Sequence, residues 1–260
     1  MKQKQRHIAT AQRSFDEILE DFPRKEKWAQ TVLSRIDRIV PIPANARILD
    51  VGAASGSFVA ACTKLEYRCE GIEPSEKART DALRLGEHLG VPVHVVAGTA
   101  ESIQYENEAF DLVHASNVIE HVADVDKAFA EAYRVLKPGC VFWFTAASSM
   151  CPKQVEIRGF PFFGWYPDFL KRRIMLWAKD NKPHLVGYSE APALNWFTPW
   201  KARKLLKKQG FMEVYDRWDL RCEGEGGAGY GTALRLIRST PLTKFLADIV
   251  VPGCSYAAVK

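Results

Sequence analysis

The sequence lacks several features that would place it in a specialised class. No stretch approaches the roughly 18 uninterrupted apolar residues of a transmembrane helix. The first residues are basic but are not followed by the apolar run of a secretory signal peptide. The six cysteines are scattered and include no C-x-x-C pair, which argues against a zinc site and against a small disulfide scaffold. We therefore expect reduced thiols and a cytoplasmic location.

The composition is that of a folded globular protein. The 260 residues are 47% hydrophobic and 26% charged, and the formal net charge is +5. That charge is unevenly distributed: residues 1–150 hold 18 basic and 21 acidic groups, whereas residues 151–260 hold 18 basic and 10 acidic groups. The excess of positive charge therefore needs a local explanation in the second half of the chain.

Strand and helix patterns alternate through the first half of the chain. An apolar helical face over 14–40 ends at Pro41, and short apolar runs at 47–51, 68–73, 93–96, 110–115 and 141–146 predict strands. Helix patterns lie between several of them, at 57–65, from Pro74 onward and at 125–136. The later pattern predicts helices at 199–209 and 242–250 and strands at 211–220 and 255–259.

This alternation predicts an α/β fold, a doubly wound Rossmann-like sheet of about seven strands. We expect one domain over 1–260, with a helical cap at 1–45 and a cofactor-binding core at 46–147. An aromatic-rich lid at 148–198 and completing elements at 199–260 would follow.

The loop after the first predicted strand carries the strongest chemical signal. Asp50 ends that strand, and Gly52 and Gly56 follow within a tight turn that lets the backbone approach a ligand. The next predicted helix can bind a negative group through its free N–H donors. Glu73, 21 residues beyond Gly52, ends the second strand, where a carboxylate can accept hydrogen bonds from a ribose diol.

Two common nucleotide loops do not match. A dinucleotide loop has G-x-G-x-x-G, but Ala54 stands at its second glycine, and the Gly-Lys-Ser/Thr end of a P-loop is absent. The loop instead resembles the first motif of class I S-adenosylmethionine-dependent methyltransferases, an acidic residue followed by Gly-x-Gly-x-Gly. Asp50, Gly52 and Gly56 match that motif, and Ala54 replaces its middle glycine.

Further blocks in the same order resemble the later motifs of this family. They are Gly71 to Ser75, Val96 to Glu101, Phe110 to Val122, Arg134 to Gly139, and Asn195 to Phe211. The resemblance implies S-adenosylmethionine as cofactor and assigns it a set of contacts: Asp50, Gly52, Ala53, Gly56, Glu73, Pro74, Thr99, Ala100, Glu101, Ser116, Asn117 and His121. Thr99 stands where the family commonly has an acidic residue for the adenine amine.

Catalytic residues are less well marked, because methyl transfer depends mainly on positioning and needs a base only when the acceptor must lose a proton. His121 is the first candidate base, with packing or a cofactor contact as the alternative. His184, Tyr188 and Tyr166 are further candidates in the lid. Some ubiquinone-biosynthesis O-methyltransferases, which this block resembles, bind a divalent ion through Glu-x-x-Glu-His. Asn117 takes the first position here, so no metal is predicted.

The lid suggests the acceptor. Residues 160–200 contain 11 of the 29 aromatic side chains, together with Lys171, Arg172 and Arg173. Aromatic walls suit a flat or apolar molecule and cations suit an acidic one, although a small separate core with a basic surface gives the same pattern. We expect a small-molecule acceptor methylated on oxygen. Sugar or lipid-linked acceptors, nitrogen or carbon targets, and a non-catalytic cofactor-binding regulator are alternatives.

Other partners are less well supported by the sequence. The Asp-Pro-Pro-Tyr type motif of base-amine methyltransferases is absent after the fourth strand, which argues against nucleic acid. Aromatic residues interleaved with cations also suit peripheral membrane contact, and the oligomeric state is open. The glycine cluster at 224–231 is interpreted as a mobile loop beside the cofactor cleft.

Overall fold

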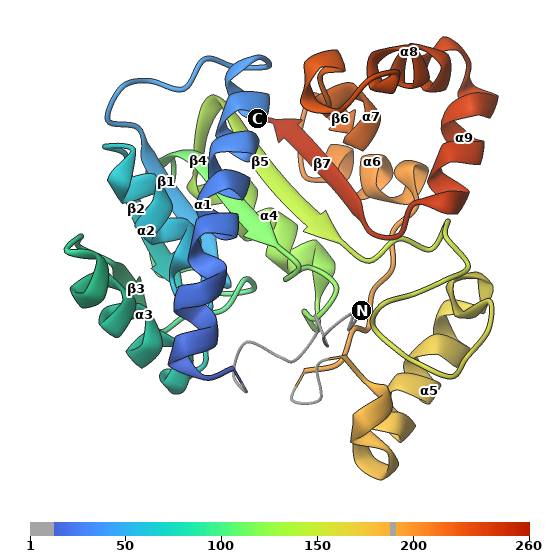
Figure 1. Ribbon diagram of the computed structural model, residues 1–260, viewed down its shortest axis with the longest axis horizontal. Coiled ribbons are helices and arrows are strands. Elements are labelled where there is room, and N and C mark those ends of the chain that lie inside the picture. Colours follow the sequence, from blue (N-terminus) through green and yellow to red (C-terminus); the bar gives the residue numbers. More distant parts are fainter. Residues whose placement is uncertain (1–12, 188–190) are drawn as a thin grey trace.

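A computed structural model describes residues 13–187 and 191–260 and contains one seven-stranded sheet. The order is β3-β2-β1-β4-β5-β7-β6, and β7 runs antiparallel to both of its neighbours. The predicted fold class is therefore confirmed (Figure 1). The strands are β1 (Arg47–Val51), β2 (Arg68–Ile72), β3 (His94–Val96), β4 (Phe110–Ser116), β5 (Leu136–Ala146), β6 (Glu213–Asp216) and β7 (Cys254–Val259).

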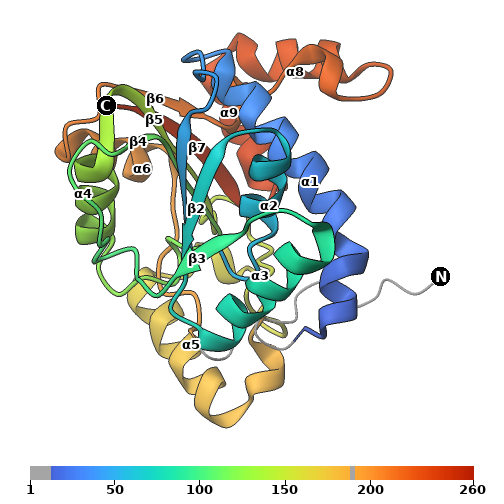
Figure 2. The ribbon, with the colours of Figure 1, turned by 90° about the vertical axis from the view of Figure 1, so that its left-hand side faces the viewer.

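Helices cover both faces of this sheet (Figure 2). On one face lie α1 (Phe15–Asp37), α2 (Ser57–Lys64) and α3 (Glu76–Leu89), which pack over an apolar core that includes Ile48 and Leu112. On the other lie α4 (Val125–Val135) and α6 (Pro199–Lys208), which bury Phe129 and Leu206 against Phe142. The central strands therefore carry mainly apolar side chains on both faces, as a covered sheet requires.

The order of the strands reverses between β1 and β4. Chain order runs outward from β1 through β2 to β3, and then returns to place β4 on the other side of β1. In doubly wound sheets the crevice outside the carboxyl ends at such a reversal is where ligands bind. The loop that starts at Gly52 follows β1, and the loop that starts at Asn117 follows β4, so both lie at this point.

The segment between β5 and α6 forms a separate structural unit at the edge to which the β5 arrowhead points (Figure 1). It contains α5 (Asp168–Asn181) and two 3-10 turns, Phe163–Trp165 and Pro183–Leu185. Its buried side chains form a core of their own: Ala147, Ile157, Phe163, Met175, Ala178, Val186, Ala193 and Trp196. This core accounts for only part of the aromatic richness of this segment, the lid: Phe163 and Trp196 lie in it, and Phe160 and Tyr166 pack against it. Five other aromatic side chains within 160–200 are exposed: Phe162, Trp165, Phe169, Trp177 and Trp200.

The structure differs from the predicted local structure at three places. The strand expected over 211–220 ends at Asp216, whose side chain accepts the N–H groups of Trp218 and Asp219 and starts the short helix α7 (Arg217–Leu220). The strand β5 begins at Leu136, so the Lys137–Gly139 turn lies within it. The helix α5 was not anticipated.

The glycine cluster at 224–231 does not lie beside the cofactor loop. Arg35, near the end of α1, donates a hydrogen bond to Glu225 at 3.0 Å, and Arg38 contacts the same carboxylate. The chain enters β1 at Arg47 soon after α1 ends, so this contact is at the amino-terminal edge of the sheet (Figure 1). The cluster leads into α8 (Tyr230–Ser239), which is followed by α9 (Pro241–Val250).

Candidate functional site

The loop after β1 can be built only with glycine at two positions. Gly52 and Gly56 have φ angles of 70° and 68°, in the left-handed region that disfavours other residues. A Cβ atom on Gly52 would lie 2.4 Å from Val118 Cγ2, and one on Gly56 would lie 2.8 Å from Ala82 Cβ. The contact with Val118 also brings the loop after β1 directly against the loop after β4.

Ala54, the residue that replaces the middle glycine, adopts the same backbone region. Its φ is 49°, which costs an L-residue about 1–2 kcal/mol. Its N–H donates a hydrogen bond of 2.9 Å to Oε2 of Glu73, across from the end of β2. A charged acceptor is a strong hydrogen-bond partner, so this contact offsets the backbone cost and holds the turn in the glycine-like conformation.

Glu73 is buried at the end of β2, with 8% of its surface exposed. Its two carboxylate oxygens accept the N–H groups of Ala54 and Ser75 at 2.9 and 3.0 Å. Burial raises the pKa of this carboxyl, while the two backbone donors oppose that rise. Each oxygen keeps a second lone pair, so the group can still accept hydrogen bonds from a diol. Pro74, next to it, is exposed.

Asp50 has a partner that the sequence did not reveal. Its Oδ1 lies 2.7 Å from Nδ1 of His114 on the neighbouring strand β4. The ring of Phe58 stacks on that histidine with 3.8 Å between ring centres. Both polar groups are almost fully buried on the face covered by α1 and α2. The alternation of β1 could have indicated this face, since Asp50 shares it with Ile48. Contact of Asp50 and of neighbouring Ala53 with a cofactor stays a prediction.

The predicted adenine residues lie at the carboxyl end of β3. Thr99 is exposed, Ala100 is buried, and Glu101 is partly buried. Oε1 of Glu101 accepts the N–H of Ala123 at 2.8 Å, which ties this segment to the loop after β4. Three loops, those after β1, β3 and β4, are thus connected at one edge of the sheet.

A polar cluster joins the ends of β4 and β5. Asn117, with a left-handed φ of 56°, donates its N–H to the backbone oxygen and to Oγ1 of Thr145, both at 3.0 Å. Ser116 Oγ lies 3.0 Å from the same hydroxyl. Thr145 was not singled out in the sequence, although its place at the end of a predicted strand was a usable signal.

Glu120 and His121 follow in the same loop and face the lid segment. Burial lowers the pKa of His121, and backbone groups of Ala191 and Pro192 oppose that shift. At neutral pH the imidazole is therefore neutral and able to accept a proton. The backbone oxygen of Glu120 accepts the N–H groups of Leu194 and Asn195 at 2.7 and 3.1 Å.

Asn195 fastens the lid to this loop. Its Nδ2 donates to the backbone oxygens of Ile119 and Val122 at 3.3 and 2.8 Å, and its side chain is buried. The guanidinium of Arg172, in α5, donates to Oδ1 of Asn195 at 3.0 Å. The sequence placed Asn195 in a block that resembles a family motif and Arg172 among the cations of the lid, but it did not predict this contact.

The other predicted catalytic side chains receive less support. His184 is exposed in the 3-10 turn after α5. The ring of Tyr166 packs in the lid core, 5.6 Å from that of Phe163. Tyr188 lies outside the described residues. The catalytic roles of His184 and Tyr188 stay predictions.

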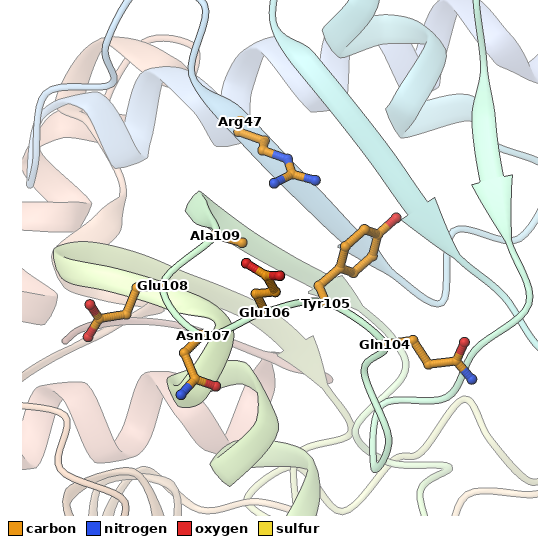
Figure 3. Close-up of a pocket in the computed structure, with 7 residues that line it drawn as sticks. All are labelled: Arg47, Gln104, Tyr105, Glu106, Asn107, Glu108 and Ala109. Carbon is orange, nitrogen blue, oxygen red and sulfur yellow. The ribbon is translucent and has the colours of Figure 1, made fainter.

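The cavity drawn in Figure 3 has a volume of about 350 Å³ and lies elsewhere. It is formed by Arg47, the first residue of β1, and by residues 104–109, which precede β4. The guanidinium of Arg47 bonds Glu70 at 2.8 Å and covers the ring of Phe110. Because these residues begin their strands, the cavity opens at the edge opposite the glycine loop.

Two searches of the described residues gave negative results. Within 13–187 and 191–260, no group of three or more His, Cys, Asp or Glu side chains could hold a metal ion. No helix in the described part of the chain combines the length and apolar character needed to cross a bilayer.

Comparison with known proteins agrees with this geometry. Residues 49–144 match a family model described as "Methyltransferase domain". A ubiquinone biosynthesis O-methyltransferase from Methylobacterium sp. is 32% identical over 134 residues, which are 50% of this chain and 54% of that protein. A sarcosine/dimethylglycine N-methyltransferase from Aphanothece halophytica is 29% identical over 140 residues, 52% of this chain and 50% of that protein. The chain thus spans about half the length of these curated relatives.

Solved structures share the fold across nearly the whole chain. Phosphoethanolamine N-methyltransferase 2 from Haemonchus contortus, in complex with S-adenosyl-L-methionine, has a TM-score of 0.56 and 20% identity. The match covers 90% of this chain and 52% of that chain. A methyltransferase from Thermotoga maritima, described as a possible histamine N-methyltransferase, has a TM-score of 0.52 and 21% identity, with 94% and 95% coverage. The resemblance to class I S-adenosylmethionine-dependent methyltransferases is confirmed over residues 49–144, which match a methyltransferase domain, and the solved structures share the fold.

Proposed function

We propose that this protein transfers a methyl group from S-adenosylmethionine to a small-molecule acceptor. The observation that carries the proposal is the pairing of the Gly52 turn with the buried carboxylate of Glu73 at adjacent strand ends. A Cβ at Gly52 would collide with Val118, so glycine at this position lets the loop after β4 pack directly against the turn. These residues fit a ligand that combines a ribose diol with a positively charged end.

The residues divide the work between holding the cofactor and holding the acceptor. We propose that Gly52, Ala53 and Gly56 let the backbone contact the cofactor and that Glu73 accepts its ribose hydroxyls. Thr99, Ala100 and Glu101 would border the adenine, and Ser116 and Asn117 would border the methionine end. The cofactor supplies an activated methyl group on a sulfonium, so the protein's task is alignment and exclusion of water.

We propose His121 as the base that takes the proton when the methyl acceptor must lose one. It is neutral at neutral pH, because burial lowers its pKa, and it lies in the loop that Val118 packs against Gly52. Replacing it by alanine should lower turnover and leave cofactor affinity almost unchanged. A wild-type rate for this variant would remove His121 from this role.

The O-methyltransferase relatives support an oxygen acceptor, and the N-methyltransferase relatives support a nitrogen acceptor. The acidic acceptor suggested by the charge of the lid loses its main support. Lys171 bonds Asp168 at 2.9 Å, and Arg172 bonds the backbone of Leu194 at 2.8 Å, so these cations are occupied within the protein.

The proposed function can be tested in two steps. Calorimetry with S-adenosylmethionine and, separately, with NAD tests the cofactor; binding of NAD alone would contradict the proposal. Transfer of labelled methyl into fractionated small metabolites, with RNA and protein fractions alongside, then tests the reaction. Cofactor binding without transfer into any fraction would favour the alternative of a non-catalytic regulator.

A further inference from the structure

Glu120 carries a buried carboxyl group with an unused hydrogen-bonding atom. Only 3% of its surface is exposed, and its Oε2 has no hydrogen-bond partner among the described residues. The carboxyl otherwise interacts with its own backbone N–H. Buried acids in folded proteins are normally paired or hydrogen-bonded, because an unsatisfied group loses its hydration without compensation. This oxygen therefore calls for a hydrogen-bond donor, and a positively charged donor suits a carboxyl group best.

No cation among the described residues pairs with the carboxyl group of Glu120. Burial raises the pKa of Glu120 to about 8, and the charge of Glu156 in the lid adds to that rise. In the described part of the chain no lysine or arginine forms an ion pair with either glutamate. Lys171 acts on Glu156 at longer range, but its ammonium bonds Asp168. His121, the next residue, is neutral when its pKa is lowered.

The position of Glu120 is that expected for contact with an acceptor. It lies two residues after Val118, which packs on the Gly52 turn, and its backbone oxygen holds the lid at Leu194 and Asn195. The residue after Asn195 is Trp196, whose buried Nε1 also has no hydrogen-bond partner among the described residues. Phe163 packs edge-on against that indole, with 5.9 Å between ring centres. The backbone of Glu120 therefore joins the loop after β4 to the edge of the lid core, where the ammonium of Lys171 lies 4.6 Å from the centre of the Trp196 ring.

We propose that the methyl acceptor carries a primary or secondary amine, and that Glu120, assisted by Glu156, binds this amine as an ammonium group. The inference rests on the proposed methyl transfer and specifies the class of acceptor for that same site. An ammonium group donates up to three hydrogen bonds; it would displace the carboxyl proton and bond the resulting carboxylate, including the oxygen that has no partner. A neutral hydroxyl compound and a carboxylate are the competing classes.

Three probes of nearly equal size separate these classes: 2-phenylethylamine, 4-ethylphenol and 3-phenylpropionate. Their binding is measured by calorimetry, with and without S-adenosylhomocysteine, in buffers of different ionisation enthalpy. We expect the amine to bind at least about tenfold more tightly than the acid, the scale of one hydrogen bond to a charged group. Because Glu120 is mostly protonated at pH 7, docking of an ammonium group should release close to one proton per site.

Glu120→Gln keeps the size of the side chain and removes its charge, so it should abolish both the amine preference and the proton release. Glu156→Gln should weaken the preference, and the exposed Glu87→Gln in α3 is the matched control with no expected effect. Equal or tighter binding of 3-phenylpropionate or 4-ethylphenol would overturn the proposal. So would failure of the amine to bind, or a preference unchanged in Glu120→Gln. Calorimetry with S-adenosylmethionine on the same samples tests the proposed function separately.

Discussion

The substitution Glu73→Gln tests the proposed ribose contact with little change in shape. Each oxygen of Glu73 accepts one backbone N–H, from Ala54 at 2.9 Å and from Ser75 at 3.0 Å. Glutamine keeps one acceptor oxygen and turns its NH₂ group toward a donor, so one of these bonds is lost along with the negative charge. Hydrogen bonds to charged groups contribute about 1.5–3 kcal/mol, which corresponds to a loss of cofactor affinity of roughly 10- to 150-fold.

Calorimetry with S-adenosylmethionine and S-adenosylhomocysteine measures this loss. Glu76→Gln, an exposed residue in the first turn of α3, is the matched control and should bind as the wild type does. An affinity of Glu73→Gln within about twofold of wild type, in a protein that folds normally, would refute the ribose role.

A second variant separates ribose contact from loop geometry. Ala54 has a φ of 49°, and Ala54→Gly removes the cost of that conformation, about 1–2 kcal/mol. The double variant Glu73→Gln with Ala54→Gly should therefore recover stability, measured by urea unfolding, but not cofactor affinity. If affinity also recovers, Glu73 acts by shaping the turn and the reasoning about ribose is wrong.

Three further predictions concern the same edge of the sheet. Gly52→Ala should reduce cofactor affinity by at least about tenfold, since its Cβ would lie 2.4 Å from Val118 Cγ2 at a φ of 70°; unchanged affinity in calorimetry would contradict the close backbone approach. The pKa of Glu120 is raised from 4.5 to about 8, so between these pH values the folded protein holds a proton that the unfolded chain has lost. The free energy of unfolding of the wild type, compared with that of Glu120→Gln, should therefore fall as the pH rises from about 4.5 to about 8. Urea unfolding that gives the same pH dependence for both proteins would contradict this. Asn195→Ala leaves two buried carbonyl oxygens without their donor and should lower the free energy of unfolding by about 2 kcal/mol, with faster hydrogen exchange in the loop after β4; unchanged exchange there would contradict the fastening role.

Much of the sheet could be predicted from local sequence patterns. The apolar runs at β1 to β5 are short, and the segments between several of them have the period of an amphipathic helix. This alternation of strands and helices along the chain predicts a parallel sheet with helices on both faces. The second half of the predicted strand over 211–220 was wrong, because its apolar residues also fit a helix and the helix start at Asp216 was overlooked. Asp216 and Asp219 form a capping box that begins α7, and this spacing was readable in the sequence.

The contacts that define the site were less accessible. The partnership of Asp50 with His114 depends on which strands are neighbours, and the link of Asn195 to the loop after β4 spans more than 70 residues. The place of the glycine cluster at the opposite edge is set by the pairing of Glu225 with Arg35, a contact of charged groups far apart in the chain. Local propensity carries no information about such pairings.

The separate core of the lid has a consequence for how the protein can change over evolutionary time. Met175 and Trp196 are buried within the lid, and the sheet buries a different set of side chains. The two cores can therefore be altered independently, because a substitution that repacks one leaves most contacts of the other intact. A chain built in this way can diverge within residues 148–198 while the sheet keeps the packing of its own core.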